Sequence, residues 1–243
     1  MTVRLDRWLA NLALGSRSEV GRLIRSGAVT VNGNCLRDPA ATCDERNDCL
    51  TVQGRPVDGR LTRHVLLYKP DGLLTAARDR KQPTVMDLLP PVYASIGCMP
   101  VGRLDKDTTG LLLLTTDGEL NHRLLAPNRH VDKTYRAEVE GEIGTDAVER
   151  VRSGLDLGDF AAAPAELVIL SAGAVSTVRL TIREGKFHQV KRMMEAVGHP
   201  VLRLHRERFG SLTLPEELAP GAWREATEEE INALYRSAQM ERA

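Results

Sequence analysis

The 243-residue sequence predicts an α+β fold with two domains, a small amino-terminal one and a larger one built on a largely antiparallel mixed sheet with flanking helices. Two observations predict this fold. Two segments with helical periodicity are followed by Asn32-Gly33, the strongest short hairpin signal. Beyond residue 64, strand-like segments are interleaved too unevenly with helical ones for a doubly wound parallel sheet.

The small domain is expected over residues 1–52 and begins with two helices. Residues 3–14 place four apolar side chains on one helical face, and a second helix follows a cap at Ser16 or Ser18. That helix ends at Gly27, and residues 28–31 form the first strand of the hairpin. Three arginines lie on or beside the polar side of the second helix: Arg17, Arg22 and Arg25.

The larger domain is expected over residues 64–243. Residues 53–63 are rich in glycine, proline and charge and have no periodicity, so we expect them to form the linker before it. The expected strands cover residues 65–68, 111–114, 131–139, 175–182 and 201–205. The expected helical segments cover residues 84–89, 119–125, 187–197 and 228–235, the last with a capping box formed by Thr227 and Glu230.

The overall charge predicts nothing about partners, because basic and acidic residues number 33 each. Their distribution is more informative. Residues 1–37 hold six arginines and two acidic residues, a net charge of +4, and residues 181–210 hold seven basic and three acidic residues, again +4. Two basic segments on a neutral chain indicate a polyanion contacted at two places, although solvated faces would give the same pattern.

The four cysteines, at positions 35, 43, 49 and 98, show neither Cys-x-x-Cys spacing nor a histidine cluster. They are typical of free thiols in a reducing compartment. No apolar run approaches the length of a membrane span, and residues 1–17 carry charge where a signal peptide needs an apolar core. We therefore expect a cytoplasmic protein with no membrane partner, and a monomer.

The candidate reactive group lies in the loop before the strand at residues 111–114. A polar run from Gly102 to Gly110 leads directly into this apolar strand, so the loop is tied to a rigid element. Asp105 is the candidate, because a reactive carboxylate tolerates little positional slack. A capped turn would also explain Asp105 and Asp107, whereas a metal site needs more oxygen ligands than this loop offers.

The strings in and after this loop resemble the central motif of a known family, the RsuA-type ribosomal RNA pseudouridine synthases. They are Gly102-Arg103-Leu104-Asp105, Asp107-Thr108-Thr109-Gly110-Leu111 and Thr115-x-Asp117-Gly118. Lys69-Pro70 resembles the first motif of the family, with a mainly structural role. The resemblance extends over nearly the whole chain, and it implies that Asp105 is the one indispensable catalytic residue. Arg103, close to Asp105 in the loop, is well placed to hold a phosphate or the gap left by the target base.

Two further motifs of the family supply candidate substrate contacts. Lys133-Thr134-Tyr135 resembles a Lys-x-Tyr motif whose tyrosine packs on the target uracil, although a strand tyrosine is by default a core residue. The run from Glu184 to Met193 resembles the last motif, in which a basic residue pairs with the catalytic aspartate. By position that residue is Lys191, but lysine is a weaker bidentate partner than arginine, so Arg192 is a second candidate.

The small domain resembles the S-four-type RNA-binding domain, which has two helices carrying arginine and a hairpin ending in Val-x-Val-Asn-Gly. Such a domain binds structured RNA through shape and phosphates, and a helical pair used only for packing is the alternative. The resemblance implies an RNA-binding surface that includes the following arginines: Arg4, Arg17, Arg22 and Arg25.

Taken together, the resemblance implies an isomerase that converts a uridine of ribosomal RNA to pseudouridine with no metal and no cofactor. Asp-Thr-Thr-Gly after Asp105 and the string from Leu204 to Gly210 resemble the small-subunit (16S) enzyme most closely. The expected partner is therefore 16S ribosomal RNA or the assembling small subunit. A 23S enzyme of the same superfamily and a non-catalytic RNA-binding factor of ribosome assembly are the alternatives.

Overall fold

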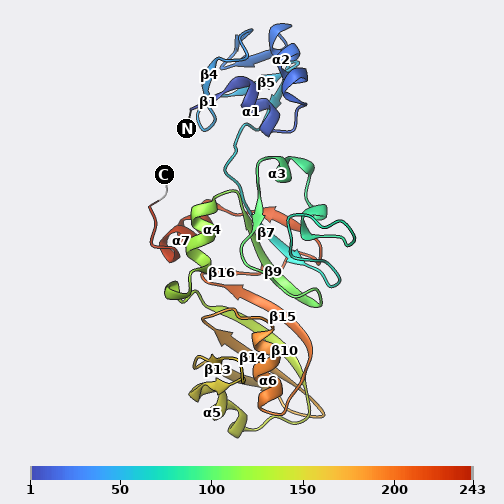
Figure 1. Ribbon diagram of the computed structural model, residues 1–243, viewed down its shortest axis with the longest axis vertical. Helices are drawn as coiled ribbons and strands as arrows, with labels where there is room; N and C mark the ends of the chain where they lie inside the picture. Colours follow the sequence, from blue (N-terminus) through green and yellow to red (C-terminus); the bar gives the residue numbers. More distant parts are fainter. Residues whose placement is uncertain (1, 242–243) are drawn as a thin grey trace. The chain divides into compact units, whose positions relative to one another are not determined.

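A computed structural model describes residues 2–241 of the chain, which divide into two compact units (Figure 1). The first unit comprises the described residues up to Arg63 together with Leu89–Met99. The second comprises His64–Leu88 and the described residues from Pro100 onward. Both combine helices and strands, and the second contains a mixed, mostly antiparallel sheet. The predicted α+β class is confirmed.

The two predicted helices of the first unit are α1 (Leu5–Asn11) and α2 (Arg17–Arg25). Helix α1 begins later than predicted because Thr2–Arg4 form strand β1, which pairs with β4 (Thr42–Asp44). Ser16 is the residue that caps α2, in a capping box with Glu19. The apolar faces of both helices are buried in the core of this unit, as predicted.

A four-stranded sheet completes the first unit, with the strand order β3-β2-β5-β6. Its strands are β2 (Val29–Val31), β3 (Asn34–Cys35), β5 (Leu50–Val52) and β6 (Arg55–Val57). Asn32 and Gly33 have φ angles of 51° and 79°, which confirms the predicted hairpin turn. The first part of the expected linker is also a hairpin: Gln53 and Gly54 have positive φ angles, and β6 folds back on β5.

The large sheet of the second unit has the strand order β13-β14-β10-β15-β9-β7-β17, and β16 extends it beside β15. These strands are β7 (His64–Lys69), β9 (Thr108–Thr115), β10 (Lys133–Glu140), β13 (Glu166–Ser171), β14 (Val175–Ile182), β15 (Val201–Phe209), β16 (Leu212–Thr213) and β17 (Trp223–Glu225). Strand β8 (Met99–Pro100) also belongs to this sheet and pairs with β9. Strands β11 (Leu155–Asp156) and β12 (Ala161–Ala162) form a separate two-stranded sheet. The helices are α4 (Gly118–Leu125), α5 (Thr145–Ser153), α6 (Gln189–Ala196) and α7 (Glu228–Ser237).

The pairing of β9 with β15 is parallel. It aligns Thr108 with Leu204 and Gly110 with Arg206. Gly110 has a φ angle of 107°, and a Cβ atom there would lie 2.3 Å from the carbonyl oxygen of Arg206. Only glycine permits this close approach of the two backbones. Gly110 therefore allows β9 to pair with β15, and this pairing connects β7 and β9 to β10 and β14 within one sheet.

Helices α4 and α7 cover the sheet beside β7 and β9 (Figure 1). Their apolar side chains pack on Leu66, Leu111 and Leu113 in one buried cluster. The hydroxyl of Tyr235 in α7 donates a hydrogen bond of 2.6 Å to Asp117, which caps α4. The predicted capping box of α7, between Thr227 and Glu230, is present.

Further elements of the second half of the fold differ from their predicted form. The helical turns expected at residues 84–89 are a 3-10 helix, Val85–Leu88, and a second short 3-10 helix covers Pro127–Arg129. Pro90 and Pro91 follow the first of these closely and cannot continue it. Pro91 also starts α3 (Pro91–Ser95) in the first unit, since proline suits the first helical position. Strand β9 begins before its apolar run, at Thr108, because it pairs there with β15.

Among the described residues, no helix combines the length and the apolar character needed to cross a membrane.

Candidate active site

The loop that carries Asp105 is fixed by a buried lysine. Lys69, at the end of β7, is fully buried, and its Nζ donates hydrogen bonds to the carbonyl oxygens of Pro70 (3.1 Å), Lys106 (2.9 Å) and Thr108 (2.9 Å). Burial lowers the pKa of Lys69 to about 8. The hydroxyl of Thr75 donates a further hydrogen bond of 2.8 Å to the carbonyl oxygen of Leu104. Lys69-Pro70 thus has a structural role, because it positions the backbone on either side of Asp105.

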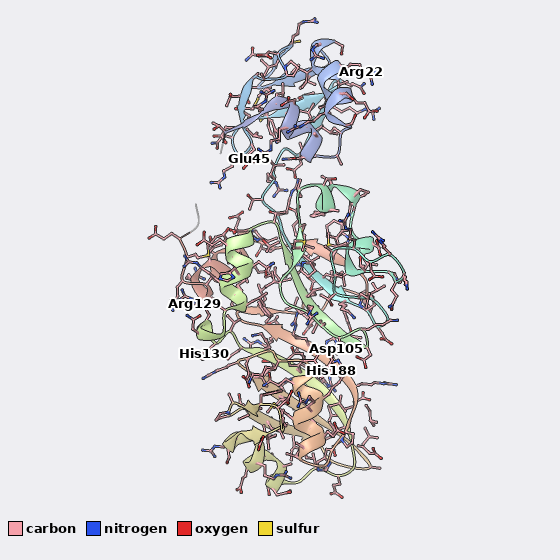
Figure 2. The ribbon with its side chains drawn as sticks, viewed as in Figure 1. Arg22, Glu45, Asp105, Arg129, His130 and His188 are labelled. Carbon is pink, nitrogen blue, oxygen red and sulfur yellow. The ribbon has the colours of Figure 1, made fainter. Side chains whose placement is uncertain are left out.

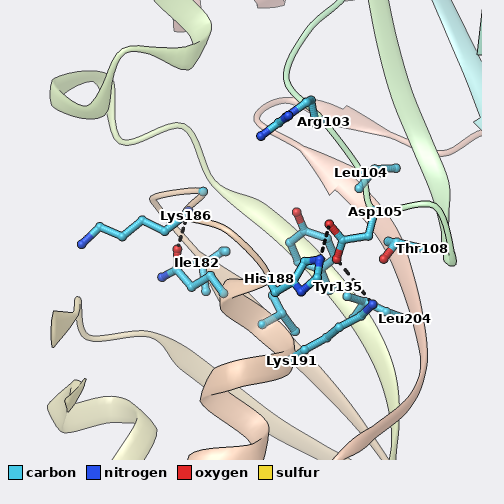
Figure 3. A pocket seen from close by; sticks show the side chains of 13 residues that line it. Arg103, Leu104, Asp105, Thr108, Tyr135, Ile182, Lys186, His188, Lys191 and Leu204 are labelled. Carbon is cyan, nitrogen blue, oxygen red and sulfur yellow. Dashed lines mark hydrogen bonds and ion pairs between the residues drawn. The ribbon is translucent and has the colours of Figure 1, made fainter. Parts of the chain in front are cut away.

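Asp105 lies between two nitrogen-bearing side chains. Its Oδ2 is 3.5 Å from Nζ of Lys191, and its Oδ1 is 3.6 Å from Nε2 of His188. The Asp105 side chain is 29% exposed, so the carboxylate remains open to a substrate. Figure 2 shows Asp105 and His188 side by side, and Figure 3 shows the contacts between these groups.

The structure separates the two candidate cations. Lys191 is the one near Asp105, and it also donates hydrogen bonds of 2.6 and 2.8 Å to the two carboxylate oxygens of Asp107. The hydrogen bond from Lys191 lowers the pKa of Asp107. Arg192 instead forms an ion pair with Asp159 and donates a hydrogen bond of 2.8 Å to the carbonyl oxygen of Leu157. Arg192 is therefore not brought together with Asp105.

A shallow pocket surrounds Asp105. Its lining residues come from the Asp105 loop, from β9, β10, β14, β15 and α6, and from the turn between β14 and α6: Arg103, Leu104, Asp105, Thr108, Tyr135, Ile182, Gly185, Lys186, His188, Gln189, Val190, Lys191 and Leu204. Tyr135, in β10, is 8% exposed, and in Figure 3 its ring lies next to Asp105. Arg103 is exposed and lines the same pocket. The pocket thus combines a carboxylate, a cation, an aromatic ring and apolar walls, which suits a planar polar base.

His188 is a site residue that the helical pattern did not single out. The pattern placed it in a helix from residue 187, whereas α6 begins at Gln189 and His188 precedes it with φ 51° and ψ 27°. A non-glycine residue in this left-handed region is strained by about 1–3 kcal/mol, so its surroundings must hold it there. The signal that could have found it is its place within the family motif, three residues before Lys191.

The turn before α6 is held by a polar network. The side chain of Gln189 is 3% exposed; its oxygen accepts from the backbone nitrogen of Lys186 (3.0 Å) and its nitrogen donates to Glu184 (2.6 Å). Glu184 also accepts from the backbone nitrogen of Ala163 at 2.8 Å. This network fixes the residues between β14 and α6 that border the pocket.

One cation of the second basic segment is not available to a polyanion. Arg206 is 2% exposed, and its Nε donates a hydrogen bond of 2.8 Å to the carbonyl oxygen of Leu111. The pKa of the neighbouring Lys133 is lowered to about 8, mainly by the burial of Lys133 itself and also by the positive charge of Arg206. The prediction that Arg206 belongs to a charged surface is therefore wrong, because this side chain stabilises the β9–β15 contact from inside.

The candidate RNA contacts in the first unit are exposed. Arg17, Arg22 and Arg25 project from α2, and Figure 2 labels Arg22. Arg4 is exposed and paired with Asp6 at 2.8 Å. An exposed ion pair of this kind is worth little, so Arg4 remains able to exchange its partner for a phosphate.

Within residues 2–241, no group of three or more His, Cys, Asp or Glu side chains is arranged to hold a metal ion.

Comparison with known proteins agrees with this architecture. The family model described as RNA pseudouridylate synthase matches residues 63–196, and the model described as S4 domain matches residues 3–48. An uncharacterized RNA pseudouridine synthase, YtzG, of Bacillus subtilis is 43% identical over 96% of this chain and 98% of its own length.

Two further matches cover nearly the full length. The ribosomal small subunit pseudouridine synthase A of Escherichia coli K12 is 40% identical over 94% of this chain and 98% of its own. A crystal structure of a pseudouridylate synthase matches with a TM-score of 0.67 and 33% identity, over 96% of this chain and 99% of that one.

Proposed function

We propose that this chain, which belongs to the RNA pseudouridylate synthase family, converts a uridine of small-subunit (16S) ribosomal RNA to pseudouridine. The observation that carries the proposal is the meeting of Asp105, Lys191 and Tyr135 in one pocket. The small-subunit substrate is inferred from the names of full-length relatives in Escherichia coli and Vibrio vulnificus, 40% and 39% identical.

The reaction is an isomerisation, so the product contains the same atoms as the substrate. The bond between N1 of uracil and C1′ of ribose breaks, a bond between C5 and C1′ forms, the C5 proton leaves and N1 gains a proton. No electrons are gained or lost and no other reactant is consumed. We assign Asp105 as the catalytic residue, whose carboxylate attacks the sugar or the base, or takes a proton from the sugar, and is then released.

Lys191 supports that carboxylate when the substrate covers it. A bound base excludes water, and an ionised group in a water-poor site needs a compensating charge nearby. The ammonium of Lys191, 3.5 Å from Asp105, supplies it. Arg192 has no such role in this proposal, because Asp159 and the Leu157 carbonyl engage it.

The target uridine has to leave its stack to reach a carboxylate in a pocket, which requires a few kcal/mol of unstacking. Tyr135 compensates part of this by stacking on the everted base, worth about 1–3 kcal/mol. Arg103, exposed at the same pocket, holds a phosphate or the gap in the RNA. The exposed arginines of the first unit add affinity through phosphate contacts, and therefore bind without choosing the uridine.

The test maps pseudouridines in the ribosomal RNA of cells with and without this protein. We expect one position of 16S RNA to change to unmodified uridine in its absence, and purified protein to restore it on 16S RNA or on an assembling small subunit. A change confined to 23S RNA would assign the protein to the other ribosomal subunit. Binding of ribosomal RNA with every uridine left unchanged would make it a non-catalytic factor.

A further inference from the structure

Phe187 is an aromatic side chain with no place in the core. It is 70% exposed, more than any other large apolar side chain among the described residues. It lies in the turn between β14 and α6, directly before His188. Apolar surface of this size left in water contributes nothing to folding, so a partner for it is to be sought outside the chain.

The Phe187 ring is held close to the candidate active site. It stacks on the ring of His188, with centroids 3.8 Å apart and planes inclined by 19°. His188 in turn places its Nε2 3.6 Å from Asp105. The Gln189–Glu184 network holds the turn, so the ring is positioned before any substrate arrives. One face of Phe187 is covered by His188, and most of its remaining surface is accessible.

Two cations line the pocket together with His188, the residue on which Phe187 stacks. One of them, Lys186, directly precedes Phe187; its Nζ lies 3.8 Å from Glu184 and 4.1 Å from the centre of the Phe160 ring. The Lys186 side chain is 44% exposed. Arg103 lines the pocket too, and among the described residues its guanidinium has neither a hydrogen-bond nor an ion-pair partner. An accessible aromatic face with cations beside it is the combination that single-stranded nucleic acid binds, through its bases and its phosphates respectively.

We propose that Phe187 stacks on the base of the nucleotide next to the target uridine. When the uridine leaves its stack, its neighbour loses a stacking partner, and Phe187 replaces it at the rim while Tyr135 receives the everted base. This subsite rests on the proposed function. It makes Phe187 a binding residue for flanking RNA, and Asp105 remains the catalytic residue.

The test is a double-mutant cycle between the protein and the RNA. The RNA is the shortest 16S fragment that the wild-type protein modifies, prepared intact, with an abasic residue 5′ of the target uridine, and with one 3′ of it. We expect Phe187→Ala to lower kcat/KM about tenfold on the intact RNA, the loss that ~1.4 kcal/mol of stacking corresponds to. On one of the two abasic RNAs the loss should fall below twofold, because that RNA has no base to stack.

Two control variants complete the design. Phe187→Trp should retain activity on the intact RNA, and Leu202→Ala, which removes an exposed apolar side chain from β15, should be neutral on all three RNAs. Equal losses by Phe187→Ala on all three RNAs would assign Phe187 a structural or protein-binding role instead. A loss below twofold on the intact RNA would also overturn the subsite. If the wild-type protein modified no fragment of 16S RNA at all, the proposed function itself would be overturned.

Discussion

Lys191 is held more closely by Asp107 than by Asp105. Its Nζ lies 2.6 and 2.8 Å from the two carboxylate oxygens of Asp107 and 3.5 Å from Oδ2 of Asp105. Asp107 therefore positions the ammonium group and takes up part of its charge, while Asp105 keeps an open side for a substrate. A lysine shared in this way can move toward Asp105 once a bound base displaces water from the pocket.

Asp105→Asn should abolish pseudouridine formation while leaving folding and RNA binding intact. The amide has nearly the same shape but can neither attack the sugar nor accept a proton. The measurements are release of the C5 proton from labelled RNA, thermal unfolding and RNA affinity. Residual turnover within tenfold of wild type would refute the assignment of Asp105.

Lys191→Met and Arg192→Met form a matched pair of neighbouring cations. Removing Lys191 should lower kcat by about 100-fold or more, because the loss of a charge-assisted interaction in a water-excluded site is large. Removing Arg192 should change kcat less than threefold, because its charge is engaged with Asp159. Single-turnover rates at saturating RNA give the comparison. Equal losses from the two substitutions would contradict the distinction that the structure makes.

Tyr135→Phe should retain most activity, whereas Tyr135→Ala should lose at least 100-fold in kcat/KM. Stacking on the everted base requires the ring and not the hydroxyl group. Steady-state kinetics on 16S RNA measure the difference, and thermal unfolding shows how much of the Ala effect is lost packing. If Tyr135→Phe proved as inactive as Tyr135→Ala, the hydroxyl and not the stack would be the functional group.

Lys69→Met should change how stability depends on pH. Burial lowers the pKa of Lys69 to about 8 in the folded protein, below its ordinary value of 10.5. Between these values the unfolded chain binds the proton that the folded one has released, so wild-type stability gains up to about 1.4 kcal/mol per pH unit from this group. Below pH 8 the group is charged in both states and contributes no slope.

Urea unfolding of wild type and Lys69→Met at pH 7.5, 9 and 10 measures this effect. The wild-type protein should gain stability relative to the variant as the pH rises from 8 to 10. Lys133 also has its pKa lowered to about 8, but it is present in both proteins and cancels in the difference. Stability curves that run parallel over this range would show that Lys69 is not desolvated.

Much of this site was predictable because the informative residues are local in sequence. The apolar run at residues 111–114 and the alternation in 175–182 predicted β9 and β14, and the motif around Asp105 predicted its loop. The buried positions of Lys69 and Arg206 were not predictable. Charged residues usually mark surface, and these two are buried only because strands distant in sequence surround them. The contacts of Lys191 with Asp105 and Asp107 likewise join segments that are distant in sequence, so the sequence alone did not decide between Lys191 and Arg192.

Neutralising Arg17, Arg22 and Arg25 together as glutamines should weaken binding of ribosomal RNA and flatten its salt dependence. Removing one phosphate contact lowers the slope of log K against log[salt] by about 0.7–0.9, so the slope of the triple variant should fall by about 2–3. Affinity measured from 50 to 300 mM KCl tests this, with the exposed Arg236→Gln in α7 as control. An unchanged slope would remove the first unit from the RNA-binding surface.

The contact at Gly110 limits how this enzyme can diverge. Asp105 lies in the loop that leads into β9, on one side of that contact, and Tyr135 lies in β10, on the other side. A methyl group at position 110 would collide with the backbone of Arg206 and so move the two residues apart. Random mutagenesis should therefore yield inactivating alleles at a residue that carries no functional group. Related enzymes with new RNA targets are expected to vary the loops around the pocket but to keep glycine at the position of Gly110.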